Sequence, residues 1–234
     1  MIKDIFNVII SLPSQHIYSG IISSILCIAG TWFYNKSTGR IKSLIIHLIG
    51  YIVILNELMF QIYMLYYGIW SLQSSLPLEM CYLTALFIPF YAKNQSSRLL
   101  KTWFFFAGFG GSLVAFINTN LSDVEHICAF IHYFFAHGIV IYVMFIIVAD
   151  GYLPEWKDYF QAIKWTTYLV ISVIVVNIIL GSNYMFTFEK PSGTNFTLLM
   201  PDWPYYFLIM LFIGICLYTL MMSISELVKI RKLS

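Results

Sequence analysis

The sequence predicts an all-α, polytopic membrane protein: a bundle of seven transmembrane helices with a short N-terminal interfacial helix. Of its 234 residues, 60% are hydrophobic, 18% are aromatic and only 10% are charged. The mean hydropathy is +0.80. Soluble domains carry about 25% charged residues. This chain therefore has too few charges to coat a water-facing surface, which argues against a soluble enzyme, a nucleic-acid binder or a disordered protein.

Seven apolar segments account for most of the chain. A spanning helix needs about 20 predominantly apolar residues. The segments are residues 17–34, 44–67, 76–92, 99–117, 127–149, 163–181 and 205–223. The first predicts a span rather than a signal peptide, because no basic region precedes it and no small-residue cleavage motif follows. Residues 1–12 are too short to span, and we expect them to lie along the outer interface.

The basic residues predict the orientation. Lysine and arginine collect on cytoplasmic loops. Alternate loops and the C-terminal tail hold 11 of the 13 basic residues, namely Lys36, Arg40, Lys42, Lys93, Arg98, Lys101, Lys157, Lys164, Lys229, Arg231 and Lys232. The opposite side has Lys3 and Lys190. We therefore expect one domain over residues 1–234, with the N-terminus outside and the C-terminus cytoplasmic, in the bacterial plasma membrane.

Polar residues inside the segments are the candidates for function, because ionisable groups in hydrocarbon are costly and rare. With this orientation and a rise of about 1.5 Å per residue, most of them fall at one level in the outer half of the membrane. His47 is the exception and lies in the inner half. The outer-half candidates are His16, Asn56, Glu57, Glu79, Cys81, His132, His137 and Asn177.

Helical phase limits which of these side chains can share a pocket. Residues two apart on a straight helix point about 200° apart, so Glu79 and Cys81 face opposite sides, unless Pro77 distorts the first turn. We favour Glu79 as the pocket residue, because a thiol tolerates an apolar surface and a carboxylate does not. His132 and His137 are five apart and are not the i, i+4 pair typical of a zinc site.

The four cysteines lie in apolar stretches without a C-x-x-C pair, so we expect neither a disulfide framework nor a zinc site, and no cofactor. A metal held by Glu57, Glu79 and one histidine is a less favoured alternative. Two carboxylates beside two histidines can keep one histidine basic enough to take a proton from a hydroxyl or water, and the same histidine can activate a thiol. The alternative is that these residues pair only to hold helices together.

Several motifs resemble the bacterial YwaF-like integral membrane family. They are Pro13–His16, Leu76–Cys81, Gly111–Leu121, His132–Gly138, Gly181–Phe186 with Lys190-Pro191, and Asp202–Tyr205. The resemblance covers nearly the whole chain. That family is related to vertebrate transmembrane protein 164, which is described as a phospholipid acyltransferase that uses a cysteine. More distant relatives are lipid hydrolases.

The resemblance implies that His137 takes part in chemistry and that His132, His16, Asn183 and Tyr184 line the same site. Two departures from the family motifs affect which of these roles can be assigned to this chain. Glu79 stands where the bacterial pattern usually has histidine, and the vertebrate cysteine aligns with Leu78, one turn before Cys81.

The leading hypothesis is an enzyme that transfers or hydrolyses an acyl group of an outer-leaflet lipid. His137 is its general base, Glu79 or Glu57 the acid that orients it, and Cys81 or a water the nucleophile, with His132 beside them. Substrate-binding candidates are Glu57, Asn56, Asn177, His16, Asn183 and Tyr184. The alternative is a non-enzymatic transporter subunit or receptor that holds a small ligand or lipid. Membrane lipid is the expected partner, a second membrane subunit is left open, and nucleic acid is not expected.

Overall fold

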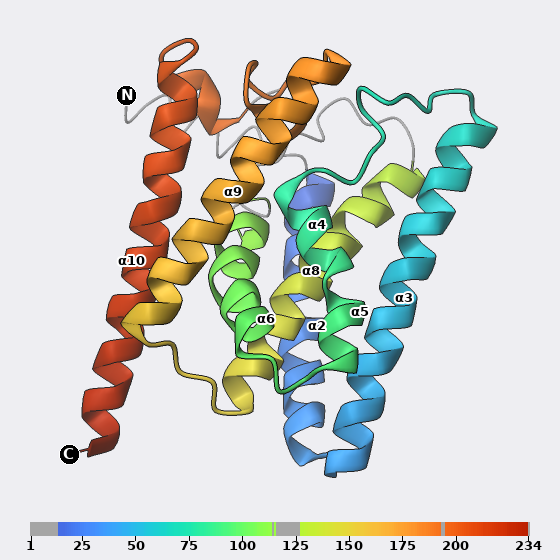
Figure 1. The fold of residues 1–234 in the computed structure, drawn as a ribbon. Helices are drawn as coiled ribbons and strands as arrows, with labels where there is room; N and C mark the ends of the chain where they lie inside the picture. The colour runs from blue at the N-terminus through green and yellow to red at the C-terminus, as the bar shows by residue number, and fades with distance from the viewer. Residues whose placement is uncertain (1–13, 114, 116–126, 193–194, 234) are drawn as a thin grey trace.

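A computed structural model describes residues 14–113, 115, 127–192 and 195–233, and every described element is helical. The elements are α2 (Ser14–Lys36), α3 (Gly39–Tyr66), α4 (Met80–Leu86), α5 (Ile88–Lys93), α6 (Arg98–Trp103), η1 (Phe104–Leu113), α8 (Ile127–Ala149), α9 (Trp156–Leu180), η2 (Tyr184–Phe186), η3 (Phe196–Leu199) and α10 (Tyr205–Leu233). Their long axes lie side by side in one bundle (Figure 1).

Five described helices are long and apolar enough to cross a membrane. They cover His16–Lys36, Gly39–Tyr66, Ile127–Ala149, Trp156–Leu180 and Tyr205–Arg231. The all-α, multi-pass prediction is confirmed at this level. The shorter pairs α4–α5 and α6–η1 lie between the long helices (Figure 1). A count of seven spans stays a prediction, and residues 1–12, the expected interfacial helix, lie outside the described residues.

The third and fourth apolar segments differ most from the sequence prediction. The predicted helix over 76–92 begins only at Met80 and is divided at Phe87, with Pro89 in the first turn of α5. Proline lacks the N–H that would continue a helical ladder. The fourth segment forms the α-helix α6 followed by the π-helix η1. Most of the C-terminal end predicted for this segment lies outside the described residues.

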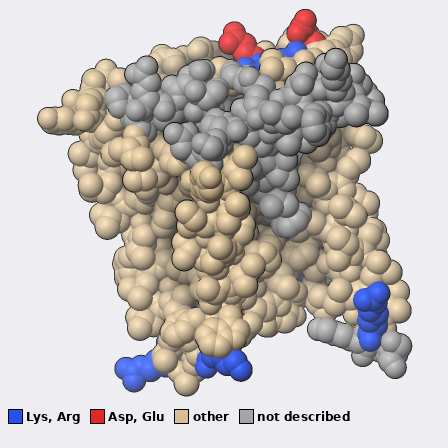
Figure 2. Space-filling model, turned by 180° about the vertical axis from the view of Figure 1, so that it is seen from behind, with Lys and Arg blue, Asp and Glu red and all other residues tan. Residues whose placement is uncertain are grey.

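The loops that carry most basic residues lie together at one end of the bundle, here called the basic end. Gln95 Nε2 donates to Ser43 Oγ over 3.2 Å, which joins the α5–α6 turn to the start of α3. Lys42 Nζ lies 3.2 Å from Asp150 Oδ1, which joins the start of α3 to the end of α8. In Figure 2 several lysine and arginine side chains lie at the lower end, and the acidic side chains, with basic ones beside them, lie at the upper end.

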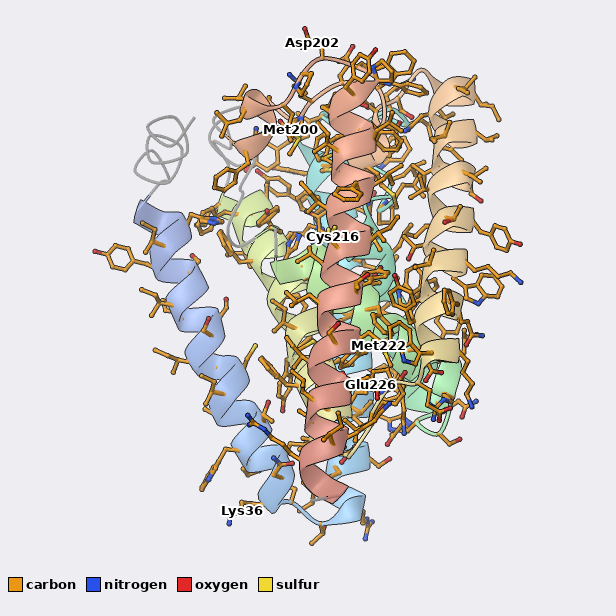
Figure 3. All side chains as sticks on the ribbon, turned by 90° about the vertical axis from the view of Figure 1, so that its left-hand side faces the viewer. Lys36, Met200, Asp202, Cys216, Met222 and Glu226 are labelled. Carbon is orange, nitrogen blue, oxygen red and sulfur yellow. The ribbon has the colours of Figure 1, made fainter. Side chains whose placement is uncertain are left out.

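The opposite end, here called the far end, is formed by the connections α3–α4 and α9–α10. Figure 3 places Asp202 there and Lys36 at the basic end, with Cys216 about halfway along α10. The main apolar core lies toward the basic end. It includes Phe104 and Phe106 of η1 with Val143 and Ile147 of α8, all fully buried.

Arg98 ties two loops of the basic end together. Its guanidinium donates to both carboxylate oxygens of buried Asp158, over 2.9 and 2.6 Å, and also to Glu155 over 2.8 Å. The hydrogen bond from Arg98 to Asp158 raises the pKa of the guanidinium above its usual value. The start of α6 is thereby fixed to the start of α9.

Replacing Arg98 tests this connection. Arg98→Ala leaves the Asp158 carboxylate, 1% exposed, without its counter-charge. We expect a loss of about 2 kcal/mol in unfolding free energy, less than for a fully buried pair because the Arg98 side chain is 44% exposed. The measurement is the thermal unfolding midpoint in detergent. Lys157→Ala is the control, because its pair with Glu155 is exposed and its loss costs less than about 1 kcal/mol. Equal midpoints for the two variants would contradict this account.

Candidate functional site

Helix α8 carries both candidate histidines through the interior of the bundle. More than half of its apolar window is buried (56%), against at most 22% for the other four candidate spans. His132 and His137 are 3% and 2% exposed. Because they stand five residues apart, the two rings leave α8 in different directions, and each meets different partners.

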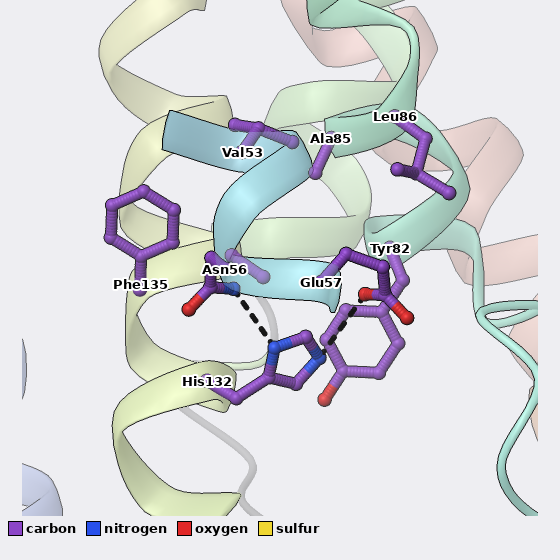
Figure 4. Close-up of a pocket in the computed structure, with 9 residues that line it drawn as sticks. Val53, Asn56, Glu57, Tyr82, Ala85, Leu86, His132 and Phe135 are labelled. Carbon is purple, nitrogen blue, oxygen red and sulfur yellow. Dashed lines mark hydrogen bonds and ion pairs between the residues drawn. The ribbon is translucent and has the colours of Figure 1, made fainter. Parts of the chain in front are cut away.

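His132 lies between two side chains of α3 (Figure 4). The Asn56 side-chain amide donates to His132 Nδ1 over 2.9 Å. His132 Nε2 faces Glu57 Oε2 at 3.6 Å. The ring stacks on Phe60, with centroids 4.0 Å apart and planes 9° apart. This is the cluster of Asn56, Glu57 and His132 that the sequence predicts at one level.

The partners of His132 define its tautomer. A neutral imidazole has one donor and one acceptor nitrogen. Nδ1 receives the Asn56 N–H, so the ring proton is on Nε2, where it faces the Glu57 carboxylate. Both ring nitrogens are therefore occupied by protein groups. This arrangement fits a positioning role for His132 better than the role of a general base.

A further polar chain leads from Glu57 toward the far end, and sequence reasoning missed it. Gln61 Nε2 donates to Glu57 Oε1 over 2.7 Å and to the Ser75 carbonyl over 2.8 Å. Trp70 Nε1 donates to Gln61 Oε1 over 2.7 Å. The i, i+4 spacing of Glu57 and Gln61 on one helix face was the signal that could have revealed it.

The space beside His132 is small. A cavity of about 10 Å³ is lined by residues of α3, α4 and α8, among them Asn56, Glu57 and Tyr82 (Figure 4). About 10–15 Å³ is needed to hold one water molecule. The cavity therefore has room for about one water and none for a larger ligand.

His137 belongs to the opposite tautomer. Its Nδ1 lies 2.6 Å from the Tyr133 carbonyl oxygen, which can only accept, so the ring proton is on Nδ1. The basic lone pair of His137 is then on Nε2. His137 thus has the protonation pattern that a general base requires, on the nitrogen away from its own helix backbone.

Tyr82 of α4 lies against both histidines. Its ring centroid is 4.8 Å from that of His132 and 5.9 Å from that of His137. The sequence analysis did not select Tyr82, because a tyrosine in an apolar helix has no signal that separates it from ordinary core packing. Cys81, its neighbour, is half-buried and its thiol is free.

Glu79 contacts the far-end loop. It lies just before α4 with an extended backbone, so the helical-phase argument for Glu79 and Cys81 was wrong, because it required a helix at both positions. Its Oε2 accepts from the Met185 N–H over 3.0 Å. Met185 and Phe186 have φ values of 57° and 50°, a left-handed conformation that is costly for residues other than glycine. Glu79 stabilises this strained turn.

Asn177, Asn183 and Tyr184 organise the same loop. The Asn177 amide donates to Tyr184 O and Thr187 Oγ1, each over 2.8 Å, and its oxygen accepts from Ser182 Oγ and the Tyr184 N–H. Asn183 Oδ1 accepts from the Phe188 N–H over 2.9 Å. Tyr184 Oη donates to Leu72 O and accepts from the Leu76 N–H. In this structure all three side chains are bonded to backbone of the far end.

His16 lies beside a groove on α2. Its buried ring packs on Phe134 of α8, with centroids 5.2 Å apart. The groove has a volume of about 420 Å³ and is lined by His16 together with Ile17, Gly20, Ile21, Ser24, Ile25 and Ile28. Twelve helical residues correspond to about 18 Å. The groove therefore runs along α2 for slightly more than the ~15 Å hydrocarbon depth of one leaflet.

The described residues hold no group of three His, Cys, Asp or Glu side chains that could bind a metal ion. Glu79 bonds the far-end loop and Glu57 faces His132, so the alternative in which Glu57, Glu79 and a histidine share a metal does not match the arrangement of these residues.

These features define a multi-pass, all-α membrane protein with a buried histidine centre. The chain belongs to the TMEM164 family, whose family model matches residues 11–222. Searches of curated proteins and of solved structures found no match to this chain. The relation to transmembrane protein 164 is thus confirmed, whereas the bacterial YwaF-like subgroup stays a prediction.

Asn177→Ala tests the organisation of the far-end loop. The substitution removes four hydrogen bonds of one buried amide, each contributing about 1 kcal/mol. We expect limited proteolysis between residues 183 and 203 to accelerate by on the order of 10-fold or more, because local opening becomes easier. Ser172→Ala, on the exposed side of α9, is the control. Unchanged cleavage in Asn177→Ala would show that other contacts hold the loop.

Proposed function

We propose that this protein is an integral membrane enzyme that transfers or hydrolyses an acyl group of a membrane lipid in the outer leaflet. The observation that carries the proposal is the state of His137: a buried ring whose Nδ1–H is bound to the Tyr133 carbonyl, which leaves the basic lone pair on Nε2. A histidine in this state can take a proton from a hydroxyl, a thiol or water.

The groove on α2 supports a lipid substrate. It is largely apolar, it begins at His16, and it runs along a helix most of whose surface is exposed. An acyl chain lying there brings its ester end to the level of His16, which packs on α8 through Phe134, three residues before His137. A water-soluble substrate would gain little from such a surface.

In this proposal His132 has a positioning role and does not act as the base. His132 is fixed by Asn56 and Glu57, and Tyr82 contacts the rings of both histidines. Glu57 therefore acts on the site through His132, and Glu79 contributes by holding the far-end turn. The sequence analysis expects Cys81 or a water as the nucleophile, and the cavity beside His132 accommodates about one water.

His137→Asn is the sharpest test. The Asn side-chain amide can replace Nδ1–H as donor to the Tyr133 carbonyl, but it provides no base at the Nε2 position. We expect acyl release or transfer to fall by about 10²–10⁴-fold. The assay uses purified protein in phospholipid vesicles that contain an isotope-labelled acyl chain, with products measured by mass spectrometry.

His47→Asn is the matched control. His47 Nδ1 bonds the carbonyl of Ser43, four residues earlier, over 2.8 Å, in the same manner as His137 bonds Tyr133. It lies on α3 near the basic end, and we expect wild-type turnover. Absence of turnover by the wild-type protein, or equal turnover in His137→Asn, would contradict the enzyme proposal. A lipid retained unmodified by all three proteins would favour a binding module.

A further inference from the structure

Ser112, near the end of η1, is a buried hydroxyl whose bonding is incomplete. The residue is fully buried, and its Oγ has no hydrogen-bond partner among the described residues. Ser225, the buried serine of α10, instead donates to the carbonyl of Met221 four residues earlier. Buried hydroxyls in proteins are bonded to protein groups or water with few exceptions. Ser112 is therefore available to bond a group other than the described residues.

Two contacts give the register of η1 against α8. A Cβ added to Gly108 would lie 3.1 Å from Val140 Cγ1. Tyr133 Oη donates to the Ala115 carbonyl over 3.0 Å. As the residue numbers rise from 108 in η1 to 115 just beyond its end, the α8 numbers fall from 140 to 133, so η1 and α8 are antiparallel. Ser112 is then level with Ala136 and His137.

The facing sides of the two helices agree with this register. One turn of a π-helix contains between four and five residues, so Ser112 lies on nearly the same face as Gly108, which meets α8. On α8, residues 133, 137 and 140 form one stripe at helical spacing. Val140 of this stripe meets Gly108 of η1, and Tyr133 bonds the carbonyl of Ala115, two residues beyond the end of η1. Ser112 and His137 thus lie on facing surfaces at one level.

We propose that Ser112, in place of Cys81 or a water, is the nucleophile of the acyl reaction, an inference that rests on the proposed function. Ser112 Oγ attacks the carbonyl carbon of a lipid ester while its proton passes to His137 Nε2. The bond from that carbon to the alcohol oxygen breaks, and His137 returns the proton to the leaving alcohol. Water or a second lipid hydroxyl then attacks the acyl-serine, with His137 again taking and returning the proton.

A long-chain alkyl fluorophosphonate tests the nucleophile directly, because serine oxygen displaces fluoride from phosphorus to leave a stable adduct. We expect wild-type protein in detergent to gain one alkylphosphonyl group, located on Ser112 by peptide mass spectrometry. Ser112→Ala should gain none, whereas Ser225→Ala should be labelled as wild type. Adduct on Cys81, adduct that persists in Ser112→Ala, or no adduct on an active protein would overturn the inference.

Turnover in vesicles separates this inference from the proposed function. We expect Ser112→Ala to lose turnover by on the order of 10³-fold or more. Its thermal midpoint should equal or exceed that of wild type, because the substitution removes a buried hydroxyl without a described partner. Retained turnover in Ser112→Ala would reject the nucleophile but keep the enzyme, and a lower midpoint would indicate a structural role instead. No turnover in wild type would reject both proposals.

Discussion

A polar ring in the interior of an apolar bundle must have its hydrogen-bond partners supplied by protein, because hydrocarbon supplies none. Helix α8 carries two such rings, and their partners come from different sources. His132 is paired across helices, with Asn56 and Glu57 of α3. His137 is paired within α8, through the Tyr133 carbonyl. The first pairing joins α3 to α8, whereas the second lies within α8 itself.

The two ends of the bundle are held by different means. At the basic end, charged groups bridge the turns, with Arg98 on Asp158 and Lys42 on Asp150. At the far end, side chains bond the backbone of two long connections, with Asn177 at the centre and the Glu79 carboxylate and the Lys190 ammonium also taking part. The far-end network joins the α9–α10 connection to the α3–α4 connection through Tyr184 and Glu79.

The sequence predicted the long helices well because an apolar run of this length indicates a membrane-spanning helix and no other element. The segment 127–149 matches α8, and the side chains of Asn56 and Glu57 lie against His132. Apolar content alone does not show whether a helix is continuous or which type it is. The break at Phe87 and the π-helical geometry of η1 were therefore missed. Polar residues near span ends were also ambiguous. Glu79 and Asn177 stabilise loops here, a role that depends on tertiary contacts far away in the chain.

Ser112 shows a further limit of sequence reasoning. A serine beside glycines in an apolar helix is normally interpreted as a small residue that allows close helix packing. Its distinguishing property is that no described residue bonds its hydroxyl, and this appears only after the surrounding side chains are placed. Tyr82 and Gln61 are similar cases, because their importance comes from contacts with His132 and Glu57.

The central claim is that the two histidines of α8 are held as opposite neutral tautomers. Nitrogen NMR of imidazole-¹⁵N-histidine protein in lipid measures this directly, with signals assigned by single His→Asn variants. The account predicts the Nε2–H form for His132 and the Nδ1–H form for His137, with His47 as an Nδ1–H reference on its own backbone carbonyl. The same tautomer at both positions, or a protonated His137 at neutral pH, would contradict it.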